Sequence, residues 1–362
     1  MKQNKCCNYF FALWAILQSN CSLFAFSPIQ ANTILNSFTS AFYTANGTNA
    51  YFKKSQADHR PADFWEQAEM IECVIDAYDS TTNAAYQKMV SNLLNGFIRK
   101  NGSNWTSWNI YNDDIMWAVI AFARGGVACG NTNYCHLARA NFDACYARAW
   151  DGRLGGGFYW DTDNASKNAC ANGPAAIAAY LLYEIYGDPD YLKKSANLFN
   201  WERLALFNTN TGAVYDNLGT NGTLHRWTST YNQGTFIGAA NFLGHTNDAK
   251  LAAEFTFRRL ATGGILPRYG IAGNNSGFNA IFLRWLALFS QSRNLQKLYE
   301  PRLLVNATAA WNARRADGLS WCQWPEPSPG GTNLCAWDCI SSFEVMLTAD
   351  QTRNVQPPPA TH

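Results

Sequence analysis

The segment WNIYNDDIMWAVIAFAR, residues 108–124, decides the fold and the chemistry that we predict for this chain. The neighbouring acids Asp113 and Asp114 are followed by an unbroken run of apolar residues, which covers every face of the expected helix. A helix that is apolar all round lies inside a protein rather than on its surface. Asn112, directly before the acids, is suited to cap the helix. The pattern predicts a buried helix whose first turn brings two carboxylates to an interior site.

Adjacent carboxylates have two interpretations. Acids in a first helical turn often only complement the helix dipole, which stabilises a helix by about 0.3–1 kcal/mol per residue. A catalytic interpretation is favoured because Asn112 already supplies a cap and because aromatic residues crowd the segment. These aromatic residues are Trp105, Trp108, Tyr111 and Trp117.

The spacing of the two acids favours glycoside chemistry. Consecutive residues of a helix place their side chains roughly 5–6 Å apart. Carboxyl groups about 5–5.5 Å apart are what a retaining glycosidase uses, one as nucleophile and one as general acid/base. Because two acids this close do not both ionise easily, one of them is expected to keep its proton.

The composition describes a globular protein with a large core. The chain has 362 residues, of which 48% are hydrophobic and 15% are charged. The net charge of +2 gives no electrostatic reason to expect nucleic acid or an anionic membrane as partner. The 14 Trp, 17 Tyr and 22 Phe residues exceed what a core requires and suit stacking against sugar rings.

The N-terminus reads as a secretory signal. Lys2 and Lys5 precede an apolar run over residues 9–17, and Gln18 interrupts that run well before it could span a membrane. We expect a signal peptide over 1–27, a catalytic domain over 28–350 and a short tail over 351–362. The mature protein is therefore expected to be secreted, free of membrane and monomeric.

Cysteines and glycosylation sequons agree with an extracellular protein. Eight cysteines remain after signal removal, and an even count in a secreted chain predicts disulfides. Cys129 and Cys135 enclose a short polar loop and are the best candidates for a local bridge. Neither the cysteines nor the five histidines form a metal-binding pattern, so no metal or cofactor is expected. Seven Asn-x-Ser/Thr sequons follow the expected signal peptide, at Asn46, Asn101, Asn104, Asn164, Asn221, Asn274 and Asn306.

The rest of the chain is helical in pattern, with no convincing run of alternating strands. Besides 108–124, helices are expected over 62–78, 84–99, 136–151, 174–186, 191–207, 234–243, 247–260, 277–291, 295–311 and 340–347. Three strongly apolar helices each follow a polar motif, and each is followed by a more amphipathic helix. Alternation of buried and half-exposed helices is what two concentric rings require. The sequence therefore predicts an all-α (α/α)6 toroid, with the polar motifs gathered at one end around a cleft.

Four motifs, in this order, carry a resemblance to a known family. They are YNDDIMWAVIAFAR, GGGFYWD, KNACANGPAAIAAYLLYEIYGDPDYL and TYNQGTFIGAANFL. Together they resemble glycoside hydrolase family 76, the endo-α-1,6-mannanases. The resemblance implies an (α/α)6 barrel and retaining cleavage of α-1,6-mannan, with Asp113 as nucleophile and Asp114 as acid/base. It also departs from the family pattern at one point, because Asn279 stands where a lysine is expected.

Further residues are candidates for substrate binding. Asn112 neighbours the acids, Trp160 could stack on a sugar, and Asp161 could bond its hydroxyls. For residues 155–161 a purely structural hairpin, in which the glycines only permit positive φ, is an equal alternative. The motifs before the next two buried helices contribute Asn172, Tyr231, Asn232 and Gln233. For Asn172 a plain helix start with Pro174 is an equal alternative.

Other activities are conceivable for these motifs. A sugar hydroxyl could intercept the covalent intermediate, which would make the protein a transglycosidase, and a silent glycan-binding protein on the same fold is a further alternative. Asp-Asp also opens the metal motif of all-helical isoprenoid synthases. That motif needs a further acid where Trp117 stands, and no second magnesium motif follows.

Overall fold

The computed structural model describes residues 28–331 and 333–349 of the chain. The expected signal peptide and C-terminal tail lie outside these residues. The described part contains twelve α-helices: Pro28–Phe42 (α1), Phe64–Thr81 (α2), Ala84–Asn101 (α3), Asn112–Cys129 (α4), Thr132–Ala149 (α5), Ala169–Tyr186 (α6), Pro189–Ala205 (α7), Thr230–Phe242 (α8), Thr246–Phe255 (α9), Phe278–Ser292 (α10), Gln296–Ala313 (α11) and Ala336–Thr348 (α12). Three single turns, Trp105–Ser107, Arg153–Gly155 and Thr256–Leu260, complete the helical structure.

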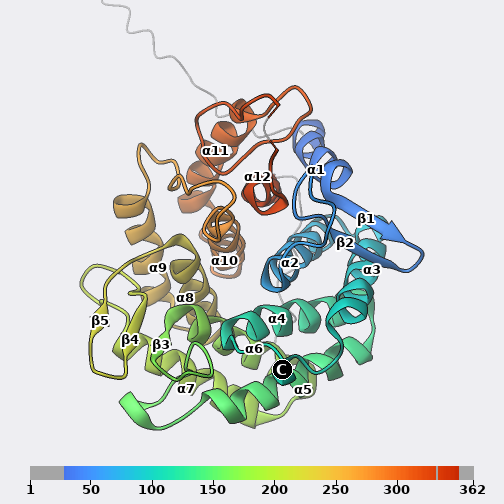
Figure 1. Ribbon diagram of the computed structural model, residues 1–362. Coiled ribbons are helices and arrows are strands. Elements are labelled where there is room, and N and C mark those ends of the chain that lie inside the picture. The colour runs from blue at the N-terminus through green and yellow to red at the C-terminus, as the bar shows by residue number, and fades with distance from the viewer. Residues whose placement is uncertain (1–27, 332, 350–362) are drawn as a thin grey trace, which may run out of the picture.

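The even-numbered helices form a closed inner ring. Each of α2, α4, α6, α8, α10 and α12 contacts the next, and α12 contacts α2. The odd-numbered helices pack outside this ring, as Figure 1 shows in a view down its axis. This arrangement confirms the predicted (α/α)6 toroid. No helix in the described part is long and apolar enough to cross a membrane.

Two small antiparallel sheets accompany the helices, and the sequence analysis missed them. Tyr43–Asn46 (β1) and Asn49–Phe52 (β2) form a hairpin. Ser166–Asn168 (β3), Asn217–Gly219 (β4) and Leu224–His225 (β5) form the second sheet in that order. Strands of two to four residues are too short to produce a visible alternation of polar and apolar residues.

Glycines allow the inner helices to approach closely. A Cβ atom on Gly173 of α6 would lie 2.7 Å from Oγ1 of Thr235 on α8. A Cβ atom on Gly234 of α8 would lie 2.6 Å from Cα of Phe282 on α10. Real Cβ atoms do not approach other atoms this closely, so the ring at these points requires glycine.

A buried group of charges connects three inner helices. We call it the α2 ion cluster: Glu69, Glu72 and Asp76 of α2, Arg124 of α4 and Arg284 of α10. Arg284 donates to Glu69 and to Asp76 at 2.6 Å each, and Arg124 donates to Glu72 at 3.0 Å and to Asp76 at 2.6 Å. Burial raises the pKa of Glu69 to about 8, although Arg284 opposes this shift. The cluster holds more carboxyl groups than guanidinium groups. Protonation of one carboxyl group therefore relieves the repulsion between the carboxylates.

The burial of the acids of α2 was not predicted from the sequence. Glu66, Glu69 and Glu72 are all buried, because α2 belongs to the inner ring. Glu69 and Glu72 meet cations from two neighbouring helices. Those cations come from residues 52 and more positions away in the sequence.

Three inner helices begin earlier than expected, and the expected disulfide does not form. Helix α6 starts at Ala169 rather than at Pro174, α8 at Thr230 rather than at Gly234, and α12 at Ala336 rather than at Ile340. Cys129 and Cys135 are free, as are the other six cysteines of the described part.

We predict that replacing Arg284 destabilises the protein strongly. Arg284→Met leaves the acids of α2 buried without their partner, which costs about 3–5 kcal/mol in the free energy of unfolding. Arg268→Met is the matched control, because Arg268 pairs with Glu326 at the surface, where an ion pair contributes about 0–1 kcal/mol. Urea denaturation of both variants measures the difference. Equal losses in the two variants would show that the cluster does not hold the ring together.

Candidate active site

The two acids lie in the first turn of α4, as the sequence predicts. The backbone in front of them pairs with the segment that carries Trp160: Asn112 N–H donates to the Trp160 carbonyl at 2.8 Å, and Tyr111 pairs with Asp161. This pairing brings the Trp160 indole against the acids, where its Nε1–H donates to Oδ2 of Asp113 at 3.0 Å. Trp160 is therefore a direct partner of Asp113.

Each acid has one oxygen held by a donor. The side-chain amide of Asn109 donates to Oδ2 of Asp114 at 3.1 Å. Oδ1 of Asp113 is buried, and no N–H or O–H group of the described residues donates to it. Asp113 is thus oriented through Oδ2, while Oδ1 has no N–H or O–H partner among the described residues.

Both carboxyl groups hold protons more tightly than ordinary aspartates. Burial raises the pKa of Asp113 to about 8, and the charge of Asp114 adds to this shift. Burial raises the pKa of Asp114 to about 6, although the Asn109 amide opposes it. The two groups interact, so these values belong to the pair. Near neutral pH the pair carries one proton and one negative charge.

Aromatic rings line the surroundings of the acids. Tyr111 packs against Trp160 with ring centroids 5.2 Å apart. On α8, Tyr231 stacks on Phe278 of α10 with centroids 3.8 Å apart and an angle of 17° between the rings. The Cys170 thiol in the first turn of α6 lies between Asp113 and Tyr231 and interacts with both. The first turns of α4, α6 and α8 therefore meet at the acids, and the start of α10 packs against Tyr231.

Asn112 supports the acids in a way that corrects its expected role as a cap. It is the first residue of α4, and its side chain donates to the Tyr159 carbonyl and accepts from Arg148. Arg148 also donates to the carbonyls of Thr106 and Asn109. Asn112 and Arg148 thus fix the loop that presents Asn109 to Asp114.

Two amides predicted to bind substrate are used inside the protein instead. The Asn172 side chain is buried and exchanges hydrogen bonds with the backbone of Phe158. The Gln233 side chain is buried and bonds the backbone of Val214, Gly212 and Ala252. Both lie within helices rather than on loops, and they fix neighbouring segments because buried backbone groups need partners.

The remaining candidates differ in burial and in hydrogen-bond partners. Asn232 is buried, with its amide 3.5 Å from Asp216 and its oxygen without a partner among the described residues. Asp161 is half-buried, and its carboxylate accepts from the Asp163 backbone N–H. Asn279 is buried and joins Thr230 to the Pro267 carbonyl. Among these candidates Asp161 alone is partly exposed.

The sequence analysis missed Asn109, Arg148 and Lys167. Lys167 is buried and donates to the carbonyls of Arg153 and Gly156, which fixes the glycine loop before Trp160. A lysine between Ser166 and Asn168 gives no sign of such a role. Asn109 could have been noticed, because it lies between Trp108 and Asp113 in a segment rich in aromatic residues.

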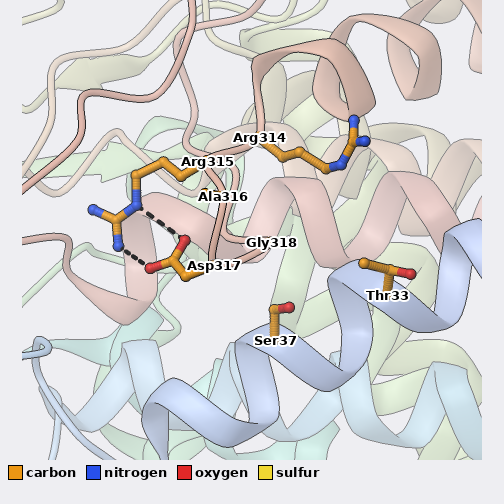
Figure 2. A pocket seen from close by; sticks show the side chains of 7 residues that line it. All are labelled: Thr33, Ser37, Arg314, Arg315, Ala316, Asp317 and Gly318. Atoms are coloured by element: carbon orange, nitrogen blue, oxygen red, sulfur yellow. Dashed lines mark hydrogen bonds and ion pairs between the residues drawn. The ribbon is translucent and has the colours of Figure 1, made fainter.

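No metal is needed to explain the charges of the described part. Cys73, Asp76 and Glu344 come within 4.8 Å of one another. However, Arg284 already donates to Asp76 and to Cys73, so a guanidinium supplies the positive charge there. A separate hollow of about 430 Å³ lies between α1 and residues 314–318 (Figure 2). None of the candidate site residues lines it, and its Arg315 is paired with Asp317.

Comparisons with known proteins agree with this fold. The sequence profile of glycosyl hydrolase family 76 matches residues 29–354. No curated protein matches the chain.

Solved structures of α-1,6-mannanase from Salegentibacter sp. HEL1_6 are similar over almost their whole length. The enzyme itself has a TM-score of 0.80 and 28% identity, covering 89% of this chain and 98% of that chain. An inactive variant, with two consecutive aspartates replaced by asparagine and in complex with α-1,6-mannotriose, has a TM-score of 0.81 and 27% identity with the same coverage. Dfg5 from Chaetomium thermophilum shares the fold at a TM-score of 0.71 and 16% identity, covering 88% of each chain.

We predict a bell-shaped dependence of activity on pH. Below about pH 6 both carboxyl groups are protonated and no nucleophile is present, whereas above about pH 8 both are ionised and no acid is present. Measurement of kcat/KM across this range should give a rise through the lower value and a fall through the higher one. Activity that stays constant on both sides of the interval would contradict the shared proton.

Proposed function

The chain belongs to glycosyl hydrolase family 76, and we propose that it is a retaining, endo-acting enzyme that cleaves α-1,6-mannosidic bonds within mannan. The observation that carries the proposal is the pair Asp113–Asp114 in the first turn of α4. It is the only pair of consecutive aspartates in the sequence. Replacement of two consecutive aspartates gives an inactive variant in the Salegentibacter α-1,6-mannanase, whose ligand is α-1,6-mannotriose.

In the first step Asp113 attacks the anomeric carbon of the mannosyl unit. Its carboxylate is oriented by the Trp160 indole, and the N-terminal end of α4 favours the negative charge. Asp114 donates its proton to the leaving oxygen, so that a covalent mannosyl ester forms on Asp113 while the rest of the chain departs. The shared proton of the pair must therefore reside on Asp114 when Asp113 attacks.

In the second step Asp114 acts as a base. It takes a proton from water, which attacks the anomeric carbon from the opposite side and releases Asp113. Two inversions give overall retention of configuration. If a sugar hydroxyl takes the place of water, the same intermediate yields a longer chain.

Trp160 and Tyr111 supply aromatic surface next to the acids, and Asp161 adds a partly exposed carboxylate on the same strand pairing. Rings and neutral groups suit a neutral polysaccharide, because sugar rings present apolar faces to aromatic side chains. We also propose that the enzyme is secreted. The support for this is the signal-like sequence of residues 1–27, together with the extracellular character of mannan as a substrate.

We predict that replacement of Asp113 and replacement of Asp114 have different effects on activity. Asp113→Asn should abolish turnover, because no covalent intermediate forms. Asp114→Asn should lose activity on mannan but recover it on substrates with activated aryl leaving groups, which need no acid, and with azide, which needs no base. Initial rates with and without azide measure this. Asp163→Asn, on the exposed turn after Trp160, is the control and should keep normal activity. Near-native activity of Asp113→Asn would refute the assignment.

We further predict internal cleavage of unbranched chains. An endo enzyme acting on debranched α-1,6-mannan should release a ladder of oligosaccharides, and intact branched mannan should be cut more slowly because side chains obstruct the site. Chromatography of products over time distinguishes the cases. Release of mannose alone would exclude endo action, and products longer than a starting oligomannoside would establish transfer.

A further inference from the structure

The connections that surround the acids carry a common sequence feature. Residues 102–111, 150–168, 206–229 and 261–277 lead from an outer helix or its last turn into α4, α6, α8 and α10. The first turns of α4, α6 and α8 meet at the acids through Asp113, Cys170 and Tyr231, and Phe278 at the start of α10 packs against Tyr231. Each of the four connections contains a sequon, at Asn104, Asn164, Asn221 and Asn274. We call these four asparagines the rim sequons.

The opposite end of the ring differs. Its connections, 82–83, 130–131, 187–188, 243–245 and 293–295, contain no sequon. They are short because an inner helix and the outer helix that follows it are direct neighbours. Among the connections of these two sets, the sequons therefore occur only at the end of the ring that holds the acids.

Two of the rim sequons present an amide nitrogen without a bond to the protein. Asn104 is exposed, and the Thr106 hydroxyl donates to its Oδ1 at 2.9 Å, so that the hydroxyl of the sequon contacts its own asparagine. Asn221 is exposed at the turn between β4 and β5, and its Oδ1 accepts from the Thr223 backbone at 2.9 Å. In both cases the oxygen is engaged and the residue is exposed, and no bond from Nδ2 to another described residue is seen.

The other two rim sequons lie equally open. Asn164 is exposed in a left-handed turn with φ of 55°, four residues after Trp160. The neighbouring Thr220 bonds the Ala165 carbonyl, so the turn that carries Asn221 lies beside Asn164. Asn274 is exposed, and its carbonyl accepts from the Trp337 indole at 2.8 Å. Its backbone is thus fixed while its side chain stays free to react.

Asn306 provides a contrast inside the same chain. It is fully buried in α11, and its side chain bonds the backbone of Leu266, Gly264 and Arg302. A transferase could reach it only in an unfolded chain. Asn46 provides a second contrast, because it is exposed on the β1–β2 hairpin, which packs against the outer helix α3.

We propose that the rim sequons are N-glycosylation sites and that their glycans surround the mouth of the catalytic site and restrict the approach of long polysaccharides. The donor is a lipid-diphosphate-linked oligosaccharide of the secretory pathway. Asparagine Nδ2 forms a bond to the anomeric carbon of the first sugar and loses one proton, while the bond from that carbon to the diphosphate oxygen breaks and the lipid diphosphate leaves. The effect on polysaccharides rests on the proposed function, but the modification itself does not.

Peptide mapping tests the modification without reference to activity. The full chain, secreted from insect cells, is treated with an amidase that removes N-glycans in heavy-oxygen water, which converts each modified asparagine into a labelled aspartate. Label is expected at Asn104, Asn164, Asn221 and Asn274 and is expected to be absent at Asn306. Unlabelled rim sequons would overturn the proposal, and label at Asn306 would overturn the accessibility argument on which it depends.

The effect on access is measured on the folded protein before and after the same treatment, so that no rim sequon has to be replaced. Rates on α-1,6-mannotriose and on debranched mannan are compared as a ratio. Removal of the glycans should raise the ratio of polymer to trisaccharide cleavage, whereas Asn46→Gln should leave it unchanged. An unchanged ratio after removal would overturn the claim of restricted approach. Loss of both rates in every sample would instead count against the proposed function.

Discussion

The α2 ion cluster is the interaction on which the inner ring depends. Two guanidinium groups from α4 and α10 meet the acids of α2 in a space that excludes water. Buried charges are tolerated only when they are paired, so the three helices must keep their relative positions for the fold to persist. Because Arg124 fixes the middle of α4, the start of that helix is held in place as well. The position of the catalytic pair therefore depends on a set of ion pairs that take no part in the reaction.

The same exclusion of water gives the acids their chemistry. Burial raises the pKa of both Asp113 and Asp114. The Trp160 indole donates to Asp113 and the Asn109 amide donates to Asp114, and these bonds orient the two carboxyl groups. Oδ1 of Asp113 is left without an N–H or O–H donor among the described residues, which costs stability but keeps it reactive. Stability supplied elsewhere in the ring offsets this cost.

Much of the architecture could be predicted from the sequence, because buried helices leave a strong signal. The all-apolar run after Asp114 identified α4, and the alternation of apolar and amphipathic helices predicted the double ring. The starts of α6 and α8 were misplaced because Pro174 and Gly234 resemble helix boundaries, although each lies inside a helix here. Local sequence does not reveal that Gly234 is needed for contact with Phe282, which comes from another helix.

The candidate site could be predicted only in part. The acids and Trp160 stand in segments of unusual composition, and the structure brings them into contact. Asn172 and Gln233, predicted to bind substrate, bond the backbone of the protein, because an amide before a buried helix is equally suited to bond a sugar or a distant backbone. Their partners, Phe158 and Val214, lie 14 and 19 residues away. One measurement tests the central claim most directly: proton NMR of the sugar first released from an α-1,6-mannoside. A retaining reaction through Asp113 predicts that the α-anomer appears first and then mutarotates, whereas initial release of the β-anomer would contradict the covalent mechanism.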